Sequence, residues 1–396
     1  MTKIPDPEKP LNPTVIKLGL VSFFADVASE MLYPLTPIFL TTVLGASMAS
    51  VGFIEGTAEA IASLLKTFSG AWSDSLRRRK PFVLVGYGLA AISKPGIGLA
   101  TGWTGVLAAR ALDRTGKGLR SAPRDAMLSE AVSEKHRGAA FGWHRAMDTL
   151  GAFLGPLIAV LFLTQNPEDM RRLFFWAAVP GLLSVLLVMS LREKEQSPAP
   201  AHWTNPFRAW KKLSGSFRGY VYAWGVFSLA NSSDVFLLMK AKSVGFTTVS
   251  VLYLYCAYNL VYAASSPWLG GLSDRMDRRK ILAAGLFVFA LVYLGFSAAF
   301  ETWHFWALFM LYGIYMGATD GVGKALAVDL CPKDMKATAV GILGTVTGVC
   351  TIAASSVAGV LWDRLGPGWT FYFGAAGALV ASAMLIAVTA RRANAH

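Results

Sequence analysis

The chain has 396 residues, of which 54% are hydrophobic and only 15% are charged. Soluble domains carry about 25% charged residues, so this composition excludes a soluble protein and indicates a chain that crosses a membrane many times. The formal net charge of +13 is explained by basic residues in cytoplasmic loops, and we expect no nucleic-acid partner.

Twelve apolar stretches follow one another, each long enough for a membrane helix of about 20 residues. The predicted spans are 15–44, 49–72, 81–101, 103–127, 139–163, 172–191, 219–241, 247–271, 281–300, 302–329, 337–361 and 369–390. They predict an all-α polytopic membrane protein with two six-helix bundles. A proline-containing basic stretch separates the sixth span from the seventh. We therefore expect a bundle at 1–191, a cytoplasmic linker at 192–218 and a second bundle at 219–396.

Basic residues gather in alternate connections, for example at 77–80 and 275–280, whereas the opposite connections are nearly neutral. By the positive-inside rule, the basic connections face the cytoplasm. This predicts a multi-pass protein of the inner or plasma membrane, with both termini in the cytoplasm. We expect a monomer without a cofactor. The three cysteines are widely spaced, and no second histidine or cysteine stands at ligand spacing from His144, so we expect no metal site.

The two halves of the chain resemble each other. Gly70-Ala-Trp-Ser-Asp74 matches Gly270-Gly-Leu-Ser-Asp274, and two further matches follow in the same order, at offsets of 200, 207 and 199 residues. Three ordered matches indicate an internal duplication, with the two bundles related by a pseudo-two-fold axis. Transporters whose halves rock about a central site are built in this way.

The repeated loop G-x-x-x-D-x-x-x-R-R after spans two and eight resembles the hallmark loop of the major facilitator superfamily. Arg77 and Asp277 stand where that pattern has its second glycine. A carboxylate at a helix end can pair with an arginine nearby and hold one conformation closed. The expected gating residues are Gly70, Asp74, Arg78, Arg79, Gly270, Asp274, Arg278 and Arg279. The alternative is that these arginines only anchor the loops at the cytoplasmic side.

Spans four and five carry two further resemblances to this superfamily. Arg110-Ala-Leu-Asp113-Arg114-Thr-Gly116 is similar to its R-x-x-Q-G-x-G motif, which is linked to proton coupling, and the string D-R-x-G-K-G-x-R-x-x-P-R-D-A resembles a bacterial branch. Gly151-Ala-Phe-Leu-Gly155-Pro156 is similar to the fifth-helix motif of antiporters. Gly155 and Pro156 are therefore further gating candidates. The alternative for this motif is ordinary close packing of small residues.

Many ionisable residues fall inside the predicted spans, and Lys94 in span three is one of them. Each costs free energy in the membrane unless it has a partner, so each is a candidate for a function. The resemblance implies that helices one, four, seven and ten line the substrate cavity. The expected cavity residues are Asp26, Glu30, Tyr33, Arg110, Arg114, Lys117, Asn231, Asp234, Asp320 and Lys324. Glu30 and Asp113 are the first candidates for proton coupling, and Glu59 and Asp148 the second. The alternative for any of these charges is a structural lattice of salt bridges.

These features predict a secondary transporter that works by alternating access and exports a small molecule in exchange for protons. Uptake of an anionic metabolite by proton symport is the alternative, because span four carries an excess of arginine and lysine. A membrane sensor without transport activity is a remote alternative. We expect no enzymatic activity, because the sequence has no nucleophile–base arrangement and no phosphate-binding loop. Pro34 and Pro37 predict a kink in the first span, which either serves gating or only shapes the helix. The residues do not identify the substrate.

Overall fold

The computed structural model describes residues 11–76, 78–133, 136–166, 169–191, 193, 210, 213–332 and 336–393. Side chains are described at all of these positions except 71, 74, 274, 336, 337 and 388–393. Within this part of the chain every regular element is a helix. Arg77 and most of the expected linker at 192–218 lie outside the described residues.

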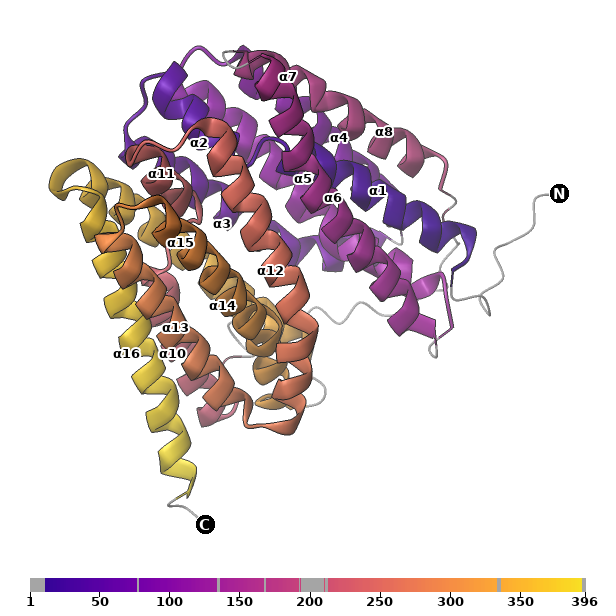
Figure 1. Ribbon diagram of the computed structural model, residues 1–396. Coiled ribbons are helices and arrows are strands. Elements are labelled where there is room, and N and C mark those ends of the chain that lie inside the picture. Colours follow the sequence, from indigo (N-terminus) through magenta and orange to yellow (C-terminus); the bar gives the residue numbers. More distant parts are fainter. Residues whose placement is uncertain are drawn as a thin grey trace. The chain divides into compact units, whose positions relative to one another are not determined.

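The helices correspond to the twelve predicted membrane segments (Figure 1). The first half contains α1 (Pro13–Glu30), α2 (Leu35–Ile38), the π-helix η1 (Phe39–Val43), α3 (Met48–Leu76), α4 (Lys80–Leu99), α5 (Trp103–Glu130), α6 (Arg137–Gln165), α7 (Met170–Trp176) and α8 (Ala178–Met189). The second half contains α10 (Gly215–Ala230), α11 (Val235–Ser243), α12 (Thr248–Arg275), α13 (Arg278–Ala298), α14 (Thr302–Asp329), α15 (Lys336–Leu365) and α16 (Pro367–Ala393). The first segment combines α1, α2 and η1, the sixth combines α7 and α8, and the seventh combines α10 and α11. The prediction of an all-helical protein with twelve segments is confirmed.

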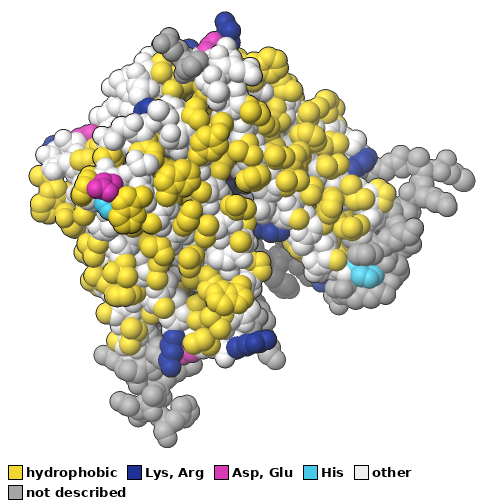
Figure 2. All heavy atoms as spheres, in the orientation of Figure 1, with side chains coloured by type: hydrophobic (Ala, Val, Ile, Leu, Met, Phe, Trp, Pro, Cys, Tyr) yellow, Lys and Arg dark blue, Asp and Glu magenta, His cyan; other side chains and the backbone are white. Residues whose placement is uncertain are grey.

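Seven helices in the described part of the chain are long and apolar enough to cross a membrane by themselves. They are Met48–Gly70, Lys80–Leu99, Arg137–Gln165, Met170–Met189, Arg278–Ala298, Thr338–Leu365 and Pro367–Ala387. Helix α5 is not among them because its arginines, lysines and acidic residues lower its hydropathy. Large apolar side chains such as Leu161, Leu186 and Trp268 are 66%, 60% and 74% exposed. Figure 2 shows such side chains spread over the visible face. An apolar surface of this extent suits contact with lipid rather than water.

The chain divides into two compact units, one of residues 1–44 and 61–203 and the other of residues 45–60 and 204–396. In the first unit α1 packs against α6 and α8, and α4 packs against α5 and α8. In the second unit α10 packs against α15 and α16, and α13 packs against α14 and α16. When the six membrane segments are numbered from the start of each half, the same pairs pack in both units: one with five, one with six, three with four, and three with six. This agrees with the internal repeat.

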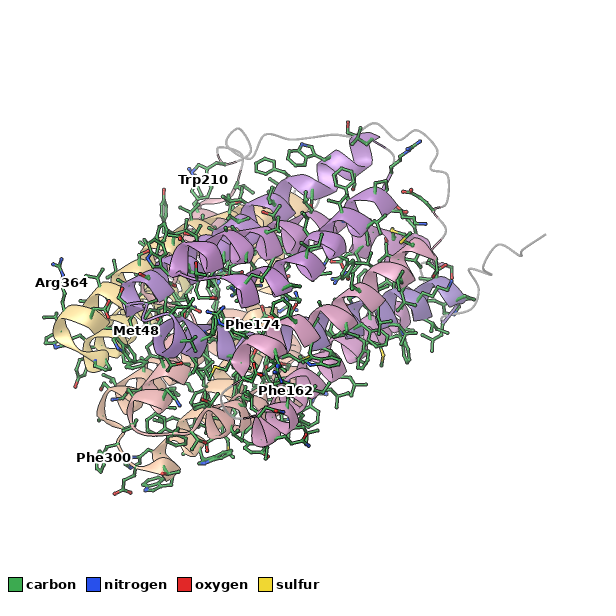
Figure 3. All side chains as sticks on the ribbon, turned by 90° about the horizontal axis from the view of Figure 1, so that it is seen from above. Met48, Phe162, Phe174, Trp210, Phe300 and Arg364 are labelled. Atoms are coloured by element: carbon green, nitrogen blue, oxygen red, sulfur yellow. The ribbon has the colours of Figure 1, made fainter. Side chains whose placement is uncertain are left out.

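The first turn of α3 belongs to the second unit and is held by an acidic side chain of α15. The amides of Met48 and Ala49 donate to the Asp363 carboxylate at 3.1 Å and 2.8 Å. Figure 3 labels Met48 and Arg364, the residue after Asp363. A carboxylate at this position satisfies helix N–H groups that have no partner within the helix.

The first membrane segment is broken in its middle, at the place where the two prolines predict a kink. Helix α1 ends at Glu30 and α2 begins at Leu35. Pro34 and Pro37 have no amide hydrogen, so they cannot donate to the carbonyls of Glu30 and Tyr33, four residues earlier. The chain forms a turn instead, in which the Leu35 amide donates to the Leu32 carbonyl at 3.0 Å.

Candidate functional site

Helices α4 and α5 cross closely, and this crossing positions the charged residues of α5. A Cβ atom added at Gly86 would lie 2.6 Å from the Gly116 carbonyl oxygen, so only glycine allows the two backbones to approach this far. The α5 face at this crossing carries Arg110, Asp113 and Arg120, all of which are buried. A polar face of this kind turns away from lipid because desolvated charges need partners.

Asp113 lies at the centre of a buried ion cluster. Lys94 Nζ is 3.0 Å from Asp113 Oδ1, and the guanidinium groups of Arg114 and Arg110 are 3.8 Å and 3.9 Å from Oδ2. Ser93 Oγ donates to the same carboxylate at 3.4 Å. Three cations around one carboxylate stabilise its ionised form and leave positive charge in excess.

A cavity of about 40 Å³ lies beside this cluster. Seven residues that the sequence singled out line it together: Asp26, Glu30, Tyr33, Arg110, Asp113, Arg114 and Lys117. The structure adds lining residues that were absent from the predicted site, namely Ser29, Leu32, Thr36, Ser93, Lys94, Ile97 and Arg120. Lys94 carried a signal in the sequence, because a lysine inside an apolar span needs a partner. Arg120 belongs to the string D-R-x-G-K-G-x-R-x-x-P-R-D-A that begins at Asp113.

The acidic residues of the site come together where α1 crosses α6. A Cβ atom added at Gly151 would lie 2.5 Å from the Phe23 carbonyl oxygen and 3.1 Å from Asp26 Cβ, and one added at Gly155 would lie 2.8 Å from the Val27 carbonyl oxygen. These contacts give both glycines a packing role. Asp26 interacts electrostatically with the acidic Asp148 and Glu30 and with the basic Lys117 and Arg120.

Asp148 is the acidic residue that α6 contributes. Its Oδ2 atom lies 3.6 Å from Nδ1 of His144, one helical turn away. Its Oδ1 atom is buried and has no hydrogen-bond partner among the described residues. A buried carboxylate oxygen without a donor costs free energy.

Glu59, the other second-choice carboxylate, lies on α3. It belongs to the part of α3 that groups with the second unit. Its side chain is exposed, whereas Glu55, one turn earlier, is buried. Glu59 does not line the cavity.

The predicted residues of the second unit form two smaller groups. The Asp234 carboxylate accepts hydrogen bonds from the hydroxyls of Tyr312 and Tyr258 at 2.6 Å and 3.2 Å. Asp320 pairs with Lys324 at 2.7 Å and accepts from the Tyr262 hydroxyl at 2.9 Å. Tyr312 was absent from the predicted site, and no signal separated it from the neighbouring tyrosines of its span.

Asn231 lies at the end of α10, beside the break in the seventh segment. Its Oδ1 atom is buried and without a hydrogen-bond partner in the described part of the chain. Neither this residue nor the two acidic groups of the second unit lines the cavity of the first unit.

The arginines of the repeated loops pair with acidic residues that were not among the predicted gating residues. Arg79 Nε donates to Glu130 at the end of α5 at 2.9 Å, and Arg278 Nη1 pairs with Asp329 at the end of α14 at 2.5 Å. In each half an arginine of the loop thus pairs with an acidic residue at the end of the fourth segment, although the offset of 200 residues aligns Arg79 with Arg279 and Arg78 with Arg278. The side chains of Asp74 and Asp274 lie outside the described residues. The sequence signal for Glu130 and Asp329 was an acidic residue at the end of the corresponding span.

The remaining gating candidates differ in the contacts that they make. Gly70 faces α5, where an added Cβ would lie 3.3 Å from Ala122 Cβ, whereas no atom lies within 4 Å of a Cβ added at Gly270. The Arg78 amide donates to the Ser73 carbonyl at 3.3 Å, and the Arg279 amide donates to Asp277 at 2.9 Å. Among the described residues no group of three histidine, cysteine or acidic side chains is placed to hold a metal ion.

Comparison with known proteins places this arrangement in a family. A model of the Major Facilitator Superfamily matches residues 18–257 and 222–396. An uncharacterised MFS-type transporter of Methanocaldococcus jannaschii is 34% identical over 386 residues, which are 96% of each chain. A nucleoside transporter structure superposes with a TM-score of 0.79 at 12% identity, covering 95% of this chain and 99% of that one. A D-xylose-proton symporter gives 0.72 at 16%, covering 94% and 95%.

At these low identities the two solved structures show the fold alone, which consists of two six-helix bundles. The family model and the archaeal relative extend over almost the whole chain. The chain therefore belongs to the Major Facilitator Superfamily and is a multi-pass membrane transporter rather than an enzyme.

Proposed function

We propose that this protein is a proton-coupled secondary transporter that moves a small molecule by alternating access, and that the carboxylates of Asp26, Glu30 and Asp148 bind the coupling proton. The observation that carries the proposal is the meeting of acidic residues from α1 and α6 beside the cavity. Carboxylates that share a desolvated site repel one another while they are ionised, and a proton relieves that repulsion.

Asp113 has a different role in this proposal. Lys94, Arg114 and Arg110 all lie within 4 Å of its carboxylate, so a proton there would leave three cations without their counter-ion. Asp113 therefore serves as a fixed anion that holds α4 and α5 together. Of the four carboxylates expected to couple protons, the geometry supports Glu30 and Asp148 more than Asp113 or the exposed Glu59.

Two directions of coupling follow from different observations. The Gly155–Pro156 element motivates export by antiport, but the packing of Gly151 and Gly155 against α1 accounts for these glycines. The excess of arginine and lysine around the cavity favours symport of an anion. Proton binding makes the cavity more positive, so an anion binds more tightly to the protonated protein, and by linkage a bound anion favours the proton. Proton and anion then move together.

Proton movement measured in liposomes tests the proposal even while the substrate is unidentified. The purified protein is reconstituted with a pH-sensitive dye inside, and carboxylates, phosphates, sugars, nucleosides and amines are added outside one at a time. A symported compound acidifies the interior, and a compound exchanged for protons makes it more alkaline. A compound that crosses through the protein without any proton movement would refute proton coupling.

Variants then assign the coupling residues. We expect Asp26→Asn and Asp148→Asn to lose uphill accumulation and to retain exchange of labelled substrate across the membrane. Asp169→Asn is the matched control, because Asp169 pairs with Arg172 outside the cavity and asparagine also caps helices. Normal uphill accumulation in both cavity variants would remove these carboxylates from the mechanism.

The membrane orientation and the oligomeric state complete the proposal. The alternation of basic and neutral connections supports cytoplasmic termini in an inner or plasma membrane. We take the monomer as the working unit.

A further inference from the structure

We propose that Arg120 binds the anionic end of the transported molecule, a carboxylate or phosphate group, in the cavity lined by α1, α4 and α5. This proposal rests on the transport function proposed above and specifies the chemistry of its substrate. The Nη1 atom of Arg120 has no hydrogen-bond partner in the ion cluster around Asp113, and a bound anion would supply one.

The first support is the state of the Arg120 guanidinium group. Arg120 is 6% exposed and lines the cavity. Its Nη1 atom is buried and has no hydrogen-bond partner among the residues that the structure describes. Guanidinium groups are strong multiple donors, and a buried donor without an acceptor costs free energy that a bound anion would recover.

The second support is the charge of the cavity wall. Five lining residues are basic (Lys94, Arg110, Arg114, Lys117 and Arg120) and three are acidic (Asp26, Glu30 and Asp113). Three of the basic residues surround Asp113. Asp26 also interacts electrostatically with Asp148, the acidic neighbour from α6. Five basic residues against four carboxylates leave one positive charge in excess, so one further anion would complete the charge balance of the cavity.

The orientation of Arg120 is fixed before any ligand binds. Its guanidinium carbon lies 4.2 Å from the centre of the Tyr87 ring, a stacking geometry that arginine adopts well. Close packing at Gly86, where an added Cβ would lie 2.6 Å from Arg120 Cβ, restricts the base of the side chain. A donor held in this way loses little entropy when it binds an oxyanion.

The size of the cavity limits what can enter it. A volume of about 40 Å³ corresponds to roughly three water molecules, at about 10–15 Å³ for each. It accommodates the oxygens of one carboxylate or phosphate group but not a whole metabolite. The site is therefore a subsite for one end group, and the rest of the substrate lies outside this cavity.

Anion binding to the purified full-length protein tests the proposal without a proton gradient. The melting temperature is measured in detergent with sodium phosphate and, separately, with sodium benzoate, each compared with sodium chloride at equal ionic strength. We expect at least one of the two probes to raise the melting temperature by about 2–5 °C, with a saturable dependence on concentration.

Substitutions then locate the binding site. We expect Arg120→Gln to abolish the shift and Arg120→Lys to keep part of it, because lysine retains the charge but not the planar fork. Arg172→Gln is the matched control, since Arg172 is an exposed arginine paired with Asp169, and it should respond like the wild type. If Arg120→Gln does not yield folded protein, the comparison of Arg120→Lys with the wild type decides the question.

The outcomes separate this inference from the transport function. If neither probe shifts the wild-type melting temperature beyond sodium chloride, or if Arg120→Gln and Arg120→Lys both respond like the wild type, the subsite is refuted. Anion binding that depends on Arg120, in a protein that moves no protons in liposomes, would support the subsite and refute proton coupling. Proton-coupled transport without anion binding would refute the subsite and support proton coupling.

Discussion

Lys94 Nζ lies 3.0 Å from Asp113 Oδ1, and both side chains are buried between α4 and α5. Loss of Lys94 removes the cation closest to this buried carboxylate and leaves the guanidinium groups of Arg114 and Arg110, which are 3.8 Å and 3.9 Å away. Breaking a buried ion pair costs up to about 3–5 kcal/mol. We therefore expect Lys94→Met to lower the melting temperature in detergent by several degrees, and Asp113→Asn to lower it further, because it leaves three buried cations without their counter-ion.

The exposed pair of Lys324 and Asp320 provides the control for this experiment. These side chains are 58% and 37% exposed, and such pairs contribute about 0–1 kcal/mol. Lys324→Met should therefore leave the melting temperature almost unchanged. An equal loss of stability in the two methionine variants would show that burial of the Lys94 pair carries no special cost.

Asp26 and Asp148 should behave as one functional unit in coupling. If they share a proton, removal of either carboxylate disables the site, and removal of the second adds little. We expect uphill accumulation in Asp26→Asn/Asp148→Asn to equal that of the worse single variant, measured as the ratio of internal to external substrate. Multiplication of the two single effects would indicate independent roles.

The crossing of α1 and α6 should tolerate no side chain at Gly151. An added Cβ would lie 2.5 Å from the Phe23 carbonyl oxygen, whereas no atom lies within 4 Å of a Cβ added at Gly142 on the same helix. We expect Gly151→Ala to lower the melting temperature by several degrees. Gly142→Ala should be neutral or stabilising, because alanine favours a helix over glycine by up to about 1 kcal/mol. The same response in both variants would rule out close packing as the reason for Gly151.

The two arginine–carboxylate pairs at the helix ends should control the rate of conformational cycling. Arg79→Gln and Arg278→Gln each remove one partner of these pairs. We expect slower exchange of labelled substrate in both variants, measured as an initial rate in liposomes. The reciprocal exchange of Arg79 with Glu130 should restore the rate in part. Wild-type rates in both single variants would reduce these arginines to membrane anchors.

Sequence reasoning predicted the features that depend on local composition. Hydropathy gave the twelve segments, and Pro34 and Pro37 gave the break in the first one. Partnerships between helices could not be derived in this way. Lys94 and Asp113 are 19 residues apart, and they meet because Gly86 and Gly116 bring α4 and α5 together.

Helical periodicity indicates which residues share a face, but it does not indicate what that face contacts. Glu55 and Glu59 are one turn apart, yet Glu55 is buried and Glu59 is exposed. Arg120 belongs to the string D-R-x-G-K-G-x-R-x-x-P-R-D-A that begins at Asp113. The sequence does not indicate that its Nη1 atom is buried without a hydrogen-bond partner among the described residues.

The break after Glu30 has a consequence for mutational scanning. At Pro34 and Pro37 the chain lacks the amide hydrogens that an uninterrupted helix would direct to the carbonyls of Glu30 and Tyr33. Replacing either proline with alanine supplies an amide and allows α1 to continue past its present end. In an alanine scan of this segment, Pro34→Ala would therefore report a gain of backbone structure beside two cavity residues, and not the loss of a side chain.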